Sequence, residues 1–252
     1  MLRTVGRVTA CSALVLGVAL LPARDDEKKE HAAVKAVPRD KDKRATEKHE
    51  SFLAQAKKGG IDLLLIGDSI TDMWGGEGHD PKTSRGQKIY EKEFLPLKAA
   101  NFGISGDRTQ HVLWRLQNGE LEGIKPKVVM LMIGTNNVFD NSAEEIADGV
   151  TAIVSEIKTK LPETKVLLLG VFPRGLKPNK ERDKLKATNA ILAKLDDGGK
   201  TVKFLDIGDK FVEADGTISK DVMYDWLHLA EKGYQIWADA VKGPIMELMD
   251  KK

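Results

Sequence analysis

The stretch Leu63-Leu64-Leu65-Ile66-Gly67-Asp68-Ser69-Ile70-Thr71 decides the fold of this chain. Its four leading apolar residues are typical of a short strand buried on both faces, and Gly67 ends the run. Ser69 follows at a tight turn, so its hydroxyl is expected just beyond the carboxyl end of a central strand, where open α/β sheets bind their ligands. Taken alone, a serine here is more often a helix cap than a nucleophile, because serine and aspartate are favoured N-caps.

Strand and helix patterns alternate along the rest of the chain, which predicts a doubly wound α/β fold with a parallel sheet. The expected strands cover residues 61–66, 99–102, 127–133, 165–172 and 202–207. The expected helices cover residues 44–58, 87–94, 109–116, 142–157, 180–196 and 231–248.

Composition limits the classes of function. The 252 residues are 41% hydrophobic, enough for one large domain, which we expect over residues 43–252. Net charge is +2 from 40 basic and 38 acidic residues, and this near balance gives no reason to expect a nucleic-acid partner. The one cysteine, Cys11, excludes an intrachain disulfide and a cysteine metal cluster.

The amino-terminal segment has the pattern of a secretory signal peptide, expected over residues 1–23. Arg3 and Arg7 precede an almost wholly apolar run over 10–21, which is too short for a stable membrane span. We therefore expect secretion, or export to a periplasm, after cleavage; the alternative is an uncleaved amino-terminal membrane anchor. Residues 24–42 are dense in charge without apolar periodicity, which predicts a solvated linker.

Polar or glycine-rich turns follow three of the predicted strands, and in a parallel sheet these turns lie at one edge. A fourth segment, Asp225-Trp226-Leu227-His228, precedes the last helix, and its Asp and His can meet within one turn. The three strand-end turns are Gly67-Asp68-Ser69, residues 103–106, and Gly134-Thr135-Asn136-Asn137.

The residue types in these turns suit acyl transfer. A serine hydroxyl needs a base to remove its proton, and a carboxylate fixes the tautomer of an imidazole base. Of the five histidines, only His228 lies after the last strand beside an aspartate, so it is the candidate base; the alternative is a packed histidine at a helix start. Backbone N–H groups of Ser69 and Gly106, with the Asn136 amide, can donate to a developing oxyanion.

Other polar and aromatic residues near these turns have two open interpretations. Trp74, His79 and Trp226 are candidates for a substrate pocket, and Trp74 and His79 fall in the glycine-rich loop 72–86. Packing in the core is the alternative for the two tryptophans. Asp68 and Asp107 are expected to bond turn amides rather than act as catalytic acids.

Four blocks of the chain resemble, in order, those of the SGNH (GDSL) hydrolases. A further run, residues 110–121, is similar to the catalytic subunits of the platelet-activating factor acetylhydrolase branch, and the resemblance covers about residues 44–250. The four blocks are Ile66-Gly67-Asp68-Ser69, Asn101-Phe102-Gly103-Ile104-Ser105-Gly106-Asp107, Gly134-Thr135-Asn136-Asn137 and Asp225-Trp226-Leu227-His228.

The resemblance implies a flavodoxin-like three-layer α/β/α sandwich with a five-stranded parallel sheet. It implies Ser69 as nucleophile, His228 as base and Asp225 as its orienting group, with oxyanion donors from Ser69, Gly106 and Asn136. No metal or organic cofactor is implied, and because the resembling subunits pair as dimers, a homodimer is one expected partnership. The signal peptide departs from those cytosolic subunits and points to a secreted bacterial-type member.

Together these features predict a secreted serine esterase that removes short acyl groups, foremost acetyl, through an acyl-enzyme. An O-acetylated carbohydrate or polysaccharide is the leading substrate, and a lipid or phospholipid acetyl ester is the alternative. From other classes of protein, the alternatives are a non-catalytic carbohydrate-binding or cell-surface module of the same fold, and a flavodoxin-like nucleotide or flavin binder.

Overall fold

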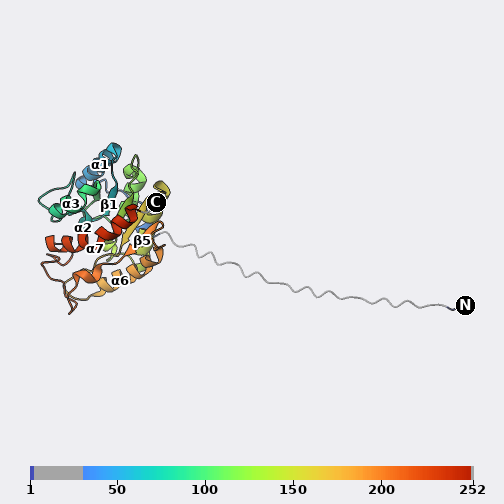
Figure 1. The fold of residues 1–252 in the computed structure, drawn as a ribbon. Coiled ribbons are helices and arrows are strands. Elements are labelled where there is room, and N and C mark those ends of the chain that lie inside the picture. The colour runs from blue at the N-terminus through green and yellow to red at the C-terminus, as the bar shows by residue number, and fades with distance from the viewer. Residues whose placement is uncertain (3–30, 251–252) are drawn as a thin grey trace.

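A five-stranded, all-parallel sheet in the order β2-β1-β3-β4-β5 forms the centre of the molecule (Figure 1). The computed structural model describes residues 1–2 and 31–250. The predicted signal peptide and residues 24–30 of the predicted linker therefore lie outside the described residues, apart from residues 1–2. The strands are β1 (Leu63–Gly67), β2 (Ala99–Gly103), β3 (Val128–Met132), β4 (Lys165–Leu169) and β5 (Val202–Leu205).

Helices cover both faces of this sheet, so the predicted doubly wound α/β architecture is confirmed. The α-helices are α1 (Lys43–Lys58), α2 (Ser69–Asp72), α3 (Gln87–Glu93), α4 (Thr109–Arg115), α5 (Ala143–Lys160), α6 (Lys180–Leu192) and α7 (Glu231–Asp250). The shorter helical turns are η1 (Ala32–Val34), η2 (Leu95–Leu97), η3 (Leu116–Glu120), η4 (Thr135–Asn137), η5 (Ala193–Leu195) and η6 (Gly208–Phe211).

The core lies in two apolar layers, because successive side chains of each strand point to opposite faces. Leu64 of β1 packs in the layer under α1, α4, α5 and α6, whereas Leu65 packs in the layer under α3 and α7. Both leucines have no exposed surface. Within the described residues, no helix is both long and apolar enough to cross a membrane.

Local signals explain where the helices begin. Asp42 caps α1, since its side chain accepts from the N–H of Ala45. Ser142 and Glu145 form the predicted capping box at the start of α5.

Residues 31–42, here called the N-terminal arm, pack against the domain, so the predicted solvated linker is wrong for this segment. Ala33 is fully buried, and its carbonyl accepts from Thr109 Oγ1 at 2.8 Å. The N–H of Val37 donates to the carbonyl of Gln110 at 3.2 Å. Charge density misled the prediction because two side chains of this charged segment bind partners on the domain: Arg39 binds Asp107, and His31 Nε2 lies 3.4 Å from Asp148.

The two-layer core predicts that truncation to alanine lowers the free energy of unfolding much more at a buried leucine than at an exposed one. Leu64→Ala empties a fully buried site and is expected to lower the free energy of unfolding by about 3 kcal/mol. Leu95→Ala, at a residue that is 53% exposed, is the matched control and should cost less than about 0.5 kcal/mol. Urea unfolding monitored by circular dichroism measures both, and equal losses would contradict this assignment of the core.

Candidate active site

Ser69 stands at the first position of α2, directly after β1. Asp68, rather than Ser69, caps this helix, because its Oδ1 accepts from the N–H of Ile70 at 3.0 Å. The serine hydroxyl is therefore free of capping, and Ser69 Oγ lies 2.9 Å from His228 Nε2. Tyr234 supports the same turn by donating its hydroxyl to the Ile70 carbonyl at 2.7 Å.

His228 is held by Asp225, as the spacing of the two residues predicted. Its Nδ1 lies 2.7 Å from Asp225 Oδ2, while Asp225 Oδ1 accepts from the backbone N–H of His228 at 2.7 Å. Between them Trp226 adopts a left-handed backbone (φ 60°), and its carbonyl accepts from the N–H of Gly175 at 2.7 Å. A left-handed backbone is unusual at a bulky residue, and here it lies in the short segment between the two hydrogen-bonded side chains.

The carboxylate of Asp225 is kept ionised by its surroundings. Partial burial raises its pKa, but the hydrogen bonds from the ring and backbone of His228 outweigh that and hold the pKa of Asp225 below its ordinary value. The ionised carboxylate fixes a proton on His228 Nδ1, which leaves Nε2 to accept one from Ser69.

Three hydrogen-bond donors lie at the ends of neighbouring strands, β1, β2 and β3. Within residues 31–250, the backbone N–H groups of Ser69 and Gly106 have no acceptor. Asn136 Nδ2 donates one hydrogen to the carbonyl of Asp107 at 2.8 Å. Gly106 has φ 83°, a region that favours glycine. The order of strands changes direction between β1 and β3, which is where open α/β sheets bind ligands.

A buried charged cluster beneath these donors was missed by the sequence analysis. Asp72, at the end of α2, accepts from the backbone N–H of Ser105 at 2.9 Å and from its hydroxyl at 2.6 Å. Lys48 Nζ lies 2.6 Å from the same carboxylate, and His79 Nδ1 lies 2.8 Å from it. Burial raises the pKa of Asp72, but bonds from His79 and Lys48 bring it well below the ordinary value, so the group is ionised.

Two of the three predicted pocket residues belong to the interior instead. His79 has a side chain with no exposed surface, and its Nε2 lies 2.8 Å from the Asn101 carbonyl. Trp74 is fully buried and packs against the rings of Phe94, Tyr234 and Trp237. Both predictions were wrong, because the glycine-rich loop folds inward and buries its large side chains.

Trp226 is half-buried, with Lys220 Nζ 4.7 Å from the ring centroid, and its place in a substrate pocket stays a prediction.

Among residues 31–250, no group of three or more His, Cys, Asp or Glu side chains is arranged to hold a metal ion. The chemistry that the site supports with its own groups is nucleophilic attack by a serine whose proton passes to an imidazole.

Comparisons with known proteins agree with this chemistry. The model of the GDSL-like Lipase/Acylhydrolase family matches residues 65–236. The chain is 41% identical over 210 residues to the platelet-activating factor acetylhydrolase IB subunit alpha2 of Homo sapiens, which covers 83% of this chain and 87% of the relative. It is 40% identical over 201 residues to the alpha1 subunit of Bos taurus, covering 80% and 82%.

Solved structures show the same fold. A GDSL-like lipase from Bacteroides thetaiotaomicron aligns with TM-score 0.62 at 18% identity, covering 79% of this chain and 97% of that one. A carbohydrate acetylesterase from Sinorhizobium meliloti aligns with TM-score 0.57 at 21% identity, covering 75% and 99%.

Asp68 predicts a pH dependence of stability. Burial raises its pKa from 3.8 to about 7, and Oδ2 has no partner within residues 31–250. The pKa of Asp68 is higher in the folded than in the unfolded state. Its contribution to the unfolding free energy is therefore fully present below pH 3.8 and is lost as the pH rises through about 7. Asp68→Asn removes this titration. The unfolding free energy of the variant, taken relative to that of the parent, should therefore rise by about 3 kcal/mol between pH 5 and pH 8.

Urea unfolding at several pH values between these limits measures the difference. Asp221→Asn, at an exposed aspartate, is the control and should change the stability by less than about 0.5 kcal/mol at every pH. A constant difference between Asp68→Asn and the parent would contradict the assigned titration.

Proposed function

The chain belongs to the GDSL-like lipase/acylhydrolase family and is a serine ester hydrolase, and from this premise we propose that it hydrolyses short-chain acyl esters, foremost acetyl esters, with Ser69 as nucleophile. One observation carries the assignment of residues. Ser69 Oγ lies 2.9 Å from His228 Nε2, and His228 Nδ1 lies 2.7 Å from Asp225 Oδ2, so nucleophile, base and orienting carboxylate form one chain of hydrogen bonds.

In the acylation step, Ser69 Oγ attacks the ester carbonyl while His228 Nε2 takes the hydroxyl proton. The carbonyl oxygen becomes an anion, for which the N–H groups of Ser69 and Gly106 and the Asn136 amide are the proposed donors. When the tetrahedral intermediate collapses, His228 returns the proton to the leaving alcohol and an acyl-Ser69 ester remains.

Deacylation repeats these steps with water. His228 removes a proton from water, the hydroxide attacks the acyl carbon, and the second tetrahedral intermediate releases the carboxylic acid. The proton on His228 then returns to Ser69 Oγ. Asp225 stays ionised throughout, since its role is to hold the imidazole tautomer and stabilise the imidazolium.

The acetyl group is the proposed acyl group because the relatives with 40–41% identity are named acetylhydrolases. For the alcohol part, an O-acetylated carbohydrate is the leading candidate, since an exported enzyme meets such polymers outside the cell. The name of the same relatives supports the alternative, a lipid acetyl ester. We also propose that the protein is exported after cleavage of its signal peptide and that it forms a homodimer. The intact hydrogen-bonded triad disfavours a non-catalytic binding module.

The proposed mechanism predicts the behaviour of three proteins on p-nitrophenyl esters from acetate to octanoate. The parent should hydrolyse acetate with the highest kcat/KM. Ser69→Ala removes the nucleophile, so kcat should fall on the order of 10⁶-fold, whereas Asp225→Ala removes only the orienting group and should cost on the order of 10⁴-fold. A folded Ser69→Ala variant as active as the parent would exclude this mechanism.

The substrate proposal is tested by direct competition. Purified protein is given an acetylated xylooligosaccharide and an acetylated ether phospholipid in separate assays, and released acetate is measured. We expect the higher kcat/KM on the carbohydrate, with Ser69→Ala as the blank for non-enzymatic release. A higher kcat/KM on the lipid would replace the carbohydrate by the alternative substrate.

A further inference from the structure

Arg39 of the N-terminal arm is bound to the turn that carries Gly106. Its Nη1 donates to the carbonyl of Ser105 at 2.8 Å and to Asp107 Oδ1 at 2.8 Å. Its Nη2 donates to Asp42, the residue that caps α1. One guanidinium therefore connects the start of α1 to the β2 turn, by which we mean residues 103–107. Arg39 precedes the residues matched by the family model, which begin at 65.

The bond to the Ser105 carbonyl also fixes the direction of the Gly106 N–H. Both groups belong to one peptide unit, and no cis peptide bond occurs in the described chain, so they point in opposite directions. Holding the carbonyl toward Arg39 therefore turns the Gly106 N–H away from the arm. A charged donor on the carbonyl also polarises the peptide, which strengthens its N–H as a donor.

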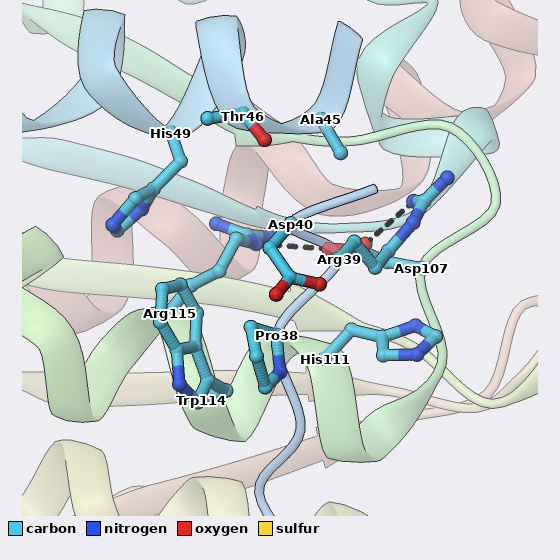
Figure 2. A pocket seen from close by; sticks show the side chains of 10 residues that line it. All are labelled: Pro38, Arg39, Asp40, Ala45, Thr46, His49, Asp107, His111, Trp114 and Arg115. Atoms are coloured by element: carbon cyan, nitrogen blue, oxygen red, sulfur yellow. Dashed lines mark hydrogen bonds and ion pairs between the residues drawn. The ribbon is translucent and has the colours of Figure 1, made fainter. Parts of the chain in front are cut away.

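A second arginine, Arg115, also holds the β2 turn, so the contact specific to Arg39 is the one with the Ser105 carbonyl. Figure 2 shows Arg39 and Arg115 approaching Asp107 from two sides. Arg115 is buried, and it donates to Asp107 Oδ2 at 2.9 Å and to the Phe102 carbonyl at 3.0 Å. Asp107 thus keeps a charged partner when Arg39 is removed, and the main loss is the hold on the Ser105 carbonyl.

We propose that Arg39 is a positioning residue of the oxyanion hole, acting through the Ser105–Gly106 peptide, an inference that rests on the proposed esterase function. Removal of the guanidinium leaves the Ser105 carbonyl without its charged partner and loosens the orientation of the peptide. A donor that is only loosely oriented stabilises the transition state less than the bound ester, so the loss falls on kcat.

A cavity beside Arg39 makes a sharp test available. A space of about 220 Å³ lies between the N-terminal arm, α1 and α4, lined by Arg39 together with Pro38, His111 and Trp114 (Figure 2). Truncation of Arg39 to alanine enlarges this cavity at the place of the guanidinium. A small guanidinium cation in solution can then reach the site and donate to the Ser105 carbonyl again.

The experiment compares kcat and KM for p-nitrophenyl acetate in the parent, Arg39→Ala and Arg39→Lys, each with and without millimolar ethylguanidinium. Arg39→Ala should lose kcat on the order of 100-fold with KM changed less than about threefold, and ethylguanidinium should restore part of kcat. Arg39→Lys keeps the charge but lacks the planar fork that reaches Ser105, Asp107 and Asp42 together, so its kcat should lie between the other two. It also guards against a folding defect of the alanine variant.

Lys43→Ala is the matched control, because this lysine begins α1 close to Arg39 in sequence and has an exposed side chain. It should keep the parent kcat and gain nothing from ethylguanidinium. A folded Arg39→Ala variant with the parent kcat, or a loss of kcat that neither lysine nor ethylguanidinium restores, would overturn the inference alone. A parent without any esterase activity would instead contradict the proposed function on which it rests.

Discussion

The parallel register of β1 with β2 and β3 is the constraint on which the site depends. Gly67 at the end of β1 pairs with Gly103 of β2 and Met132 of β3, so the chain leaves all three strands at the same level. A Cβ on Gly103 would lie 2.4 Å from the backbone nitrogen of Asp72, which shows how closely α2 packs on the end of β2. Ser69 and the turns that carry Gly106 and Asn136 therefore lie at one edge of the sheet, because the three strands end together there.

Buried charges then hold these strand-end turns in place. The Asp72 carboxylate binds the backbone and hydroxyl of Ser105 on one side and Lys48 and His79 on the other. Because an unpaired buried charge is strongly unfavourable, each partner is tied to the position of the others. Arg39 and Arg115 bind the buried Asp107 carboxylate in the same way. Groups from the N-terminal arm, α2 and α4 therefore bind the β2 turn directly, and Lys48 of α1 acts on it through Asp72.

Much of the fold, and the hydrogen-bonded pair of Asp225 and His228, could be predicted from local sequence. Five apolar runs of strand length, three of them followed by a polar or glycine-rich turn, indicated the parallel sheet, because burial on both faces leaves a continuous apolar pattern. Asp225 and His228 were found because they lie three residues apart. Trp74 was misplaced because an aromatic residue in a glycine-rich loop has the same local pattern whether the loop folds inward or outward.

The sequence by itself indicated the strands, the capping box of α5, the family blocks and the pairing of Asp225 with His228, since each depends on neighbours within a few positions. Tertiary structure alone decided that residues 31–42 pack on the domain, that His79 and Asp72 share a buried cluster, and that Arg39 reaches the β2 turn. Arg39 and Ser105 are separated by 66 positions, and the charged run around Arg39 has the composition of a solvated segment. Which charge finds a buried partner depends on distance in the folded chain, and no local pattern records it.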